Sequence, residues 1–131
     1  MARSTADASK GPDGRKRLGT LGEQLAVEYL QQHGYRIIER NFRARSGELD
    51  IIAADGDELV FIEVRTRSKT DTGHPLESIN HRKQRQVIAM ARYYLLARSV
   101  PPSQPCRFDV VAVTPDGDHW HIELVRNAFT S

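Results

Sequence analysis

Apolar residues recur at helical spacing in two segments of the chain. In the first segment these residues are Leu18, Leu21, Leu25 and Tyr29. This spacing predicts a helix over 18–32, and Gly34 is suited to end it. A second helix is predicted over 80–97, where Asn80 is a favourable N-cap residue. The chain therefore carries two helices, separated by a long segment with a different pattern.

Short apolar, β-branched runs predict strands between and after these helices. The runs 49–54 and 59–64 are separated by Asp55–Glu58, which indicates a hairpin. Further strands are predicted over 35–39, 108–113 and 120–125. The resulting order, α-β-β-β-α-β-β, predicts an α/β protein with a mixed β-sheet of about five strands flanked by helices.

Composition limits the number of domains and the compartment. With 131 residues, of which 39% are hydrophobic, the chain can bury one core, and we assign a single domain to 17–127. Residues 1–16 are polar and basic and lack periodicity, which predicts a disordered tail. The single cysteine, Cys106, allows no internal disulfide and no zinc site that needs two thiolates. No run is long enough to span a membrane, so we expect a cytoplasmic protein.

Charge is unevenly distributed, although the formal net charge is only +2. Residues 36–45 carry four arginines against one glutamate, and 65–98 carry eight basic residues against two acidic ones. These basic segments flank the acidic stretch 47–63, a pattern that suits a surface binding phosphates around an acidic centre. The candidate phosphate contacts are Arg43, Arg45, Arg67, Lys83 and Arg85. Ordinary solvated surface charge is the alternative interpretation.

The hairpin brings two acids together if its loop has four residues. Ala54 then pairs with Leu59, and Asp50 falls opposite Glu63 on the same face, with Cβ atoms ~5 Å apart. Two carboxylates converging from neighbouring strands are typical ligands for Mg²⁺. A charged pair on a solvated face is the alternative, and a slip of one residue would separate the two acids.

Other polar residues lie near this pair. Arg65 shares a strand face with Glu63 and could bind a scissile phosphate. Glu23 borders the apolar face of the first helix, where it could reach a metal at the sheet or form an ion pair. We expect Glu48 to be exposed or paired with an arginine. Asp109 either supports the site from the next strand or is a buried, hydrogen-bonded acid. Gly22 and Gly19 are interpreted as positions of close helix packing.

Several of these motifs together resemble a known family. The matching segments are LGTLGEQLAVEYL at 18–30, RNFRARSGELDII at 40–52, LVFIEVRTRS at 59–68, a second helix with Lys83 and 91–95, and RFDVVAV at 107–113. Over roughly 17–126 the chain resembles the YraN-type family of small bacterial proteins. That family is grouped with the restriction-endonuclease-like PD-(D/E)xK nucleases and is similar to archaeal Holliday-junction resolvases.

The resemblance implies a role for each site residue. It implies a restriction-endonuclease-like fold with Glu23 as the helix acid, Asp50 and Glu63 as metal ligands, and Arg65 at the position where the superfamily usually carries lysine. The family's aromatic residue before the loop glycine is also missing, because Thr72 precedes Gly73.

Three functions follow as hypotheses. The first is a metal-dependent DNA endonuclease that uses Mg²⁺ or Mn²⁺ on structured or branched DNA. A junction resolvase needs two active sites, which implies a homodimer. The second hypothesis is a non-catalytic DNA-binding module on the same fold, motivated by Arg65 and the modest net charge. The third is a protein-interaction domain that acts on a nucleic-acid machine.

Overall fold

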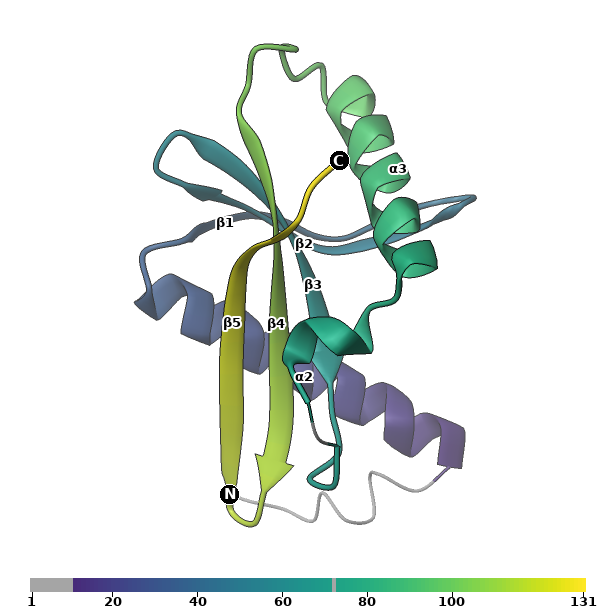
Figure 1. Ribbon diagram of the computed structural model, residues 1–131, viewed down its shortest axis with the longest axis vertical. Helices are drawn as coiled ribbons and strands as arrows, with labels where there is room; N and C mark the ends of the chain where they lie inside the picture. The colour runs from purple at the N-terminus through teal and green to yellow at the C-terminus, as the bar shows by residue number, and fades with distance from the viewer. Residues whose placement is uncertain (1–10, 72) are drawn as a thin grey trace.

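The chain folds into one sheet with a helix on each face (Figure 1). The computed structural model describes residues 11–71 and 73–131, with side chains described from residue 19 onward. Its elements in chain order are α2 (Gly11–Gln32), β1 (Arg36–Ala44), β2 (Gly47–Asp55), β3 (Glu58–Thr66), the 3₁₀-helix η1 (Pro75–Ser78), α3 (His81–Ala97), β4 (Cys106–Asp116) and β5 (His119–Phe129). The predicted order α-β-β-β-α-β-β and the α/β class are confirmed, and η1 is an addition within the connection before α3.

The sheet is mixed and its five strands lie in chain order, from β1 at one edge to β5 at the other. All neighbours are antiparallel except β3 and β4, which run parallel. A parallel pair needs a crossover connection, and α3 supplies it. The sheet therefore consists of a β1–β2–β3 meander and a β4–β5 hairpin joined through α3.

Each face of the sheet has its own apolar core. On one face, Met90 and Tyr94 of α3 pack against Phe61 of β3 and Phe108 of β4. On the other face, Leu30 of α2 joins a cluster drawn from β2, β3 and β4. The central strands are buried on both sides, which explains why their sequences read as almost continuous apolar runs.

Helix α2 ends as predicted but begins earlier. Its last residue is Gln32, and the backbone then turns through Gly34, whose φ is +89°. It begins at Gly11 instead of Leu18, so residues 11–16, which composition alone assigns to a disordered tail, are helical. Pro12 lies in the first turn, where a missing backbone N–H costs nothing. The rest of the predicted tail, 1–10, lies outside the described residues.

The predicted register of the β2–β3 hairpin is correct, although its loop is shorter than expected. Ala54 pairs with Leu59, as the four-residue loop requires. Asp55 and Glu58 also pair, which leaves only Gly56 and Asp57 in the turn. The strand predicted over 35–39 extends to Ala44, because its polar second half pairs with β2.

In β2, the regular alternation of side chains between the two faces of the sheet is broken at Asp50. Leu49 packs in the core under α3, whereas Ile51, two residues on, packs in the core under α2. In a regular strand these two side chains would lie on one face. Opposite this point on β1 is Asn41, whose φ of 55° marks a local departure from strand geometry. The bend places Asp50 at a junction between the two cores.

Helix α3 is fixed to the β1–β2 hairpin at two points. Gln86 Nε2 donates a hydrogen bond to the backbone carbonyl of Ser46 at 3.0 Å, in the turn between the two strands. Near the other end of the helix, the Arg98 guanidinium donates to both carboxylate oxygens of Glu39. These contacts hold the helix in one register over the hairpin.

Candidate metal centre

Three acids from two elements meet beside the bend in β2. Glu23 of α2 and Glu48 and Asp50 of β2 each offer one carboxylate oxygen, and these oxygens lie within 4.8 Å of one another. All three side chains are partly buried. Glu23 was predicted to border the helix face, and the structure brings it to Asp50 as the metal hypothesis requires.

Glu48 is a site residue that the sequence reasoning left outside the site. The ion pair with an arginine was correctly expected, because Arg43 Nε lies 3.5 Å from Glu48 Oε1. The same carboxyl group also joins the acidic cluster. The available signal was its position two residues before Asp50 on the same strand, which favours a shared face.

Asn41 is a second residue that the sequence did not single out. In the amide orientation that satisfies its neighbours, its nitrogen donates to Glu48 Oε2 at 2.9 Å and to Glu23 Oε1 at 3.1 Å. The amide therefore connects two of the three acids. Its role depends on the left-handed backbone at this position, which no hydrophobic pattern reveals.

Asp50 is anchored to the neighbouring strand. Its Oδ2 accepts a hydrogen bond from the backbone N–H of Val64 at 2.9 Å. The β2–β3 pairing runs as far as Ile51 and Ile62, and Asp50 and Glu63 are the next residues beyond it. Glu63 is 4% exposed, and the charge of Asp50 raises its pKa, so the two predicted ligands lie close to each other.

Glu63 faces two cations. Lys83 Nζ of α3 lies 3.5 Å from Glu63 Oε2, and Arg65 Nη1 lies 3.7 Å from the same oxygen. The acids whose oxygens could share one metal ion are Glu23, Glu48 and Asp50, and Glu63, predicted as the second ligand, lies outside this group, next to the two cations. Lys83, predicted only as a phosphate contact, thus forms an ion pair with one of the predicted metal ligands.

Burial and mutual repulsion raise the pKa values of the acids. Burial, and then the charge of Asp50, raise the pKa of Glu63 to about 7. Burial raises the pKa of Asp50, and the nearby Glu48 charge adds to this effect. The pKa of Glu23 is raised by burial and by Asp50, while the Asn41 amide opposes the rise. Grouped, partly desolvated acids that repel one another are a suitable site for a cation.

The donor set fits a hard divalent metal. Each available ligand is a carboxylate oxygen, the donor that Mg²⁺ and Mn²⁺ prefer, and no sulfur or imidazole ligand belongs to the group. Asp50 accepts a hydrogen bond from Val64, and a carboxylate has further lone pairs with which it can bind a cation. The described residues therefore contain a group that could hold a metal ion.

The predicted phosphate contacts divide between two regions. Lys83 and Arg85 line a cavity of about 600 Å³ together with Asn80, Arg82 and Gln86. Arg43 lies beside Glu48, and Arg45 precedes Ser46 in the turn that contacts α3. Arg67 instead lines a separate cavity of about 270 Å³ with Asp116 and His121. The structure thus places four of the five near the acidic cluster or α3.

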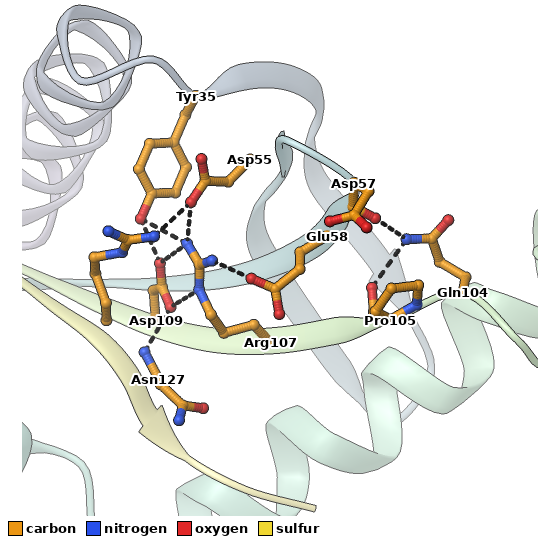
Figure 2. Close-up of polar contacts among 10 residues, drawn as sticks. Tyr35, Asp55, Asp57, Glu58, Gln104, Pro105, Arg107, Asp109 and Asn127 are labelled. Carbon is orange, nitrogen blue, oxygen red and sulfur yellow. Dashed lines mark hydrogen bonds and ion pairs between the residues drawn. The ribbon is translucent and has the colours of Figure 1, made fainter.

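Asp109 does not support the acidic cluster. Figure 2 shows that it lies in a network with Tyr35, Arg107 and Asn127. Its carboxylate accepts from the Tyr35 hydroxyl at 2.7 Å, the Arg107 Nε at 3.0 Å and the Asn127 backbone N–H at 2.9 Å. Arg107 also binds Asp55 and Glu58, near the turn of the β2–β3 hairpin. The alternative interpretation, a buried and hydrogen-bonded acid, is therefore correct.

The mixed five-stranded sheet flanked by helices agrees with the restriction-endonuclease-like class of α/β folds. Sequence comparison then identifies the family. The profile of "Uncharacterised protein family UPF0102" matches residues 22–113. The chain belongs to this family, the YraN-type family that the motifs indicated.

Relatives from distant bacteria support this assignment. A "UPF0102 protein" of Stutzerimonas stutzeri (strain A1501) is 46% identical over 113 residues, covering 86% of this chain and 94% of the relative. Another, of Persephonella marina (strain DSM 14350 / EX-H1), is 48% identical, covering 85% and 91%. A third, of Symbiobacterium thermophilum, is 50% identical, covering 87% and 97%.

Among solved structures, the chain is similar to Pyrococcus furiosus SfsA in complex with Ca²⁺. The sequence identity is 14% and the TM-score is 0.36, and the match covers 87% of this chain and 64% of that chain. This likeness is too low to support an argument about the site. Within the described residues, no helix is long and apolar enough to cross a membrane.

Proposed function

We propose that this protein is a metal-dependent endodeoxyribonuclease that acts on structured or branched DNA as a homodimer. The observation that carries the proposal is the group formed by Glu23, Glu48 and Asp50, with Glu63 as its neighbour across the hairpin. Mg²⁺ or Mn²⁺ is the proposed ion, held by Asp50 and Glu63 with assistance from Glu23. Family resemblance alone suggests branched DNA and a homodimer, in which each subunit would cut one strand of a junction.

The proposed reaction is hydrolysis of a phosphodiester bond in DNA. A divalent ion in this site would make its bound water more acidic and would offset charge on the phosphate. Hydrolysis forms a bond from the water oxygen to phosphorus and breaks the bond from phosphorus to the leaving strand. The leaving oxygen ends with a proton that the water has lost. Arg65 contacts the phosphate as a fixed positive charge, since a guanidinium is a poor general base.

Basic residues supply the surface for the nucleic acid. Arg43 and Arg45 lie on the β1–β2 hairpin, next to the first turns of α3 with Lys83 and Arg85. Positive charge around an acidic centre attracts the DNA backbone while the acids hold the metal. Arg67 is a more distant contact, because it lies at the separate cavity.

A non-catalytic DNA-binding module is the second candidate. One observation favours it: the Glu63 carboxylate is already paired with Lys83 and Arg65, so it needs no metal to balance its charge. This candidate predicts salt-sensitive DNA binding in the presence of a chelator and no cleavage with any divalent ion.

Calorimetry and cleavage assays on the same samples separate the two candidates. Mn²⁺ and Mg²⁺ would be titrated into the wild type, Asp50→Ala, Glu63→Ala and the control Glu28→Ala, which removes an exposed acid from α2. Each sample would be incubated with labelled duplex, flap and four-way DNA. The nuclease predicts metal binding and cleavage by the wild type and Glu28→Ala only. DNA binding by all four proteins, with neither metal binding nor cleavage, would support the binding module instead.

A further inference from the structure

We propose that Lys83, which reaches the site from α3, is the active-site lysine that β3 lacks. This inference rests on the proposed nuclease function and adds to it a residue that touches the scissile phosphate. The strand position that usually carries the lysine holds Arg65, which would leave this site without a compact ammonium group. Lys83 provides one from a different element.

The position of Lys83 is fixed by the start of its helix. Its backbone N–H donates to Oδ1 of the N-cap residue Asn80 at 2.8 Å. Gln84 Nε2 donates to the carbonyl of Ile79, just before the cap, at 3.0 Å. Gln86 ties the next turn to Ser46. The first turn of α3 therefore has little freedom, and Lys83 is held over β3.

From this position Lys83 faces the acids on one side and the basic cavity on the other. Its Nζ lies 3.5 Å from Glu63 Oε2, slightly closer than Arg65 Nη1 at 3.7 Å. Its side chain is 33% exposed, whereas that of Glu63 is 5% exposed. Lys83 also lines the cavity of about 600 Å³ that contains Arg82 and Arg85. Among the residues lining this cavity, it is the one that forms an ion pair with Glu63.

The chemistry of the two cations explains why they would have different roles. An ammonium carries three N–H donors on one atom, so Lys83 can bond to Glu63 and still donate to a phosphate oxygen. A guanidinium spreads its donors over a plane and suits the two outer oxygens of one phosphate. We therefore assign Lys83 to the phosphate that is cut, where its ammonium adds to the contact that Arg65 makes.

Removing the ammonium should separate cleavage from binding. In Lys83→Met, the single-turnover cleavage rate at saturating four-way DNA should fall about 100-fold, the usual cost of losing one electrostatic donor to the transition state. The Kd for the same DNA, measured in Ca²⁺, should change less than about threefold, because Arg65 and Arg85 remain. The matched control is Arg92→Met, which removes an exposed cation about 14 Å further along α3.

A second variant tests whether the role belongs to the ammonium group. Arg65→Lys combined with Lys83→Met places a lysine at the usual strand position, next to the same Glu63 oxygen. This double variant should cleave the DNA at least tenfold faster than Lys83→Met alone. A purely structural role for Lys83 predicts no recovery, because the α3–β3 contact stays absent.

Metal affinity provides a readout that does not depend on activity. Lys83→Met should bind Mn²⁺ at least as tightly as the wild type, since a positive charge next to Glu63 has been removed. Weaker Mn²⁺ binding would show that Lys83 merely positions Glu63 and would overturn the assignment. Unchanged cleavage by Lys83→Met would overturn it as well, leaving the nuclease intact. A wild type that binds no metal and cuts no DNA would instead overturn the proposed function, and this assignment with it.

Discussion

The carboxylate of Asp50 accepts a hydrogen bond from the backbone N–H of Val64, at 2.9 Å, and so joins β2 to β3 beside the acidic cluster. An oxygen of the same carboxylate also lies within 4.8 Å of oxygens of Glu23 and Glu48. The Asp50 side chain therefore both links two strands by a hydrogen bond and belongs to the candidate metal centre.

Two substitutions at Asp50 separate these roles. Asp50→Asn keeps an oxygen for the Val64 N–H but loses the charge, whereas Asp50→Ala leaves that N–H without its partner. We expect Asp50→Asn to be more stable than Asp50→Ala by about 1–3 kcal/mol, measured by urea unfolding in EDTA. Both variants should lose Mn²⁺ binding in calorimetry. Equal stability of the two would show that the hydrogen bond contributes nothing.

The raised pKa of Glu63 predicts an unusual dependence of stability on pH. A carboxyl group with a pKa of about 7 in the folded state and about 4.5 when unfolded holds its proton more tightly in the folded protein. The contribution of this proton binding to the stability of the folded protein is therefore complete below about pH 4.5 and is lost as the pH rises through 7. As the pH rises across this range, the unfolding free energy of the metal-free wild type should fall by roughly 3 kcal/mol relative to that of Glu63→Gln, whose side chain does not titrate.

Urea unfolding of both proteins in EDTA at pH 5, 6, 7 and 8 measures this difference. Adding Mn²⁺ at pH 8 should restore stability to the wild type more than to Glu63→Gln, because the ion replaces the proton as the partner of the acids. A wild type and a Glu63→Gln variant with parallel pH profiles would contradict the raised pKa.

The sequence predicted those parts of the fold that depend on local pattern. The order of elements, the end of α2 before Gly34, the N-cap at Asn80 and the pairing of Ala54 with Leu59 all follow from periodicity and turn chemistry. The start of α2 was misplaced, because the polar residues before Leu18 carry no apolar stripe even though their backbone is helical.

The candidate site was only partly predictable, for a physical reason. Asp50 and Glu63 lie across one hairpin, so the strand register alone brings them together. Glu48 and Asn41 join the site because β2 bends at Asp50 and the Asn41 backbone is left-handed. Lys83 reaches Glu63 through tertiary packing of α3. Residue spacing along the chain encodes neither the bend nor that packing.

Gly22, the residue before Glu23, packs closely against Thr66 of β3. A Cβ at Gly22 would lie 2.6 Å from Thr66 Oγ1 of β3, so a side chain there requires that the Thr66 hydroxyl rotate or that α2 move away. Gly22→Ala should push the helix outward, costing about 1–3 kcal/mol in unfolding free energy and weakening Mn²⁺ binding.

Gly19→Ala is the matched control, one turn earlier in the same helix. A Cβ there would meet nothing within 4 Å, so this change should stabilise the protein by about 0.5–1 kcal/mol and leave Mn²⁺ affinity unchanged. Only Gly22 was therefore correctly interpreted as a close-packing position. Equal effects of the two substitutions would show that the Gly22–Thr66 contact does not position Glu23.

The Arg107–Asp109 network predicts a large loss of stability without a change at the metal centre. Asp109 is fully buried and Arg107 is 6% exposed, so Asp109→Asn removes the buried partner of Arg107 and leaves it only Asp55 and Glu58, which are more exposed. We expect Asp109→Asn to cost about 3–5 kcal/mol in urea unfolding. The exposed pair of Lys69 and Asp116 offers a control, since Asp116→Asn should cost less than about 1 kcal/mol.

Metal titration of Asp109→Asn shows whether the network also serves the site. Mn²⁺ affinity in the folded variant should equal that of the wild type, because Asp109 contacts Arg107, Tyr35 and Asn127 and none of the clustered acids. Weakened Mn²⁺ binding at a temperature where the variant is fully folded would mean that the network supports the metal centre after all.

The salt dependence of DNA binding tests the basic surface independently of cleavage. Arg85 lines the cavity beside Lys83, whereas Arg36 lies exposed at the opposite end of β1 from the acidic cluster. If Arg85 contacts a phosphate, Arg85→Met should weaken binding of duplex and four-way DNA alike. It should also reduce the slope of log K against log salt by about 1, because one fewer counterion is released. Arg36→Met should leave both quantities unchanged.

These affinities would be measured by fluorescence anisotropy in EDTA at several salt concentrations, so that no cleavage occurs. Equal slopes for the wild type, Arg85→Met and Arg36→Met would place the DNA elsewhere on the protein. A slope reduced equally by both substitutions would indicate a general charge effect. Only a selective change at Arg85 supports a phosphate track that runs along α3 to Glu63.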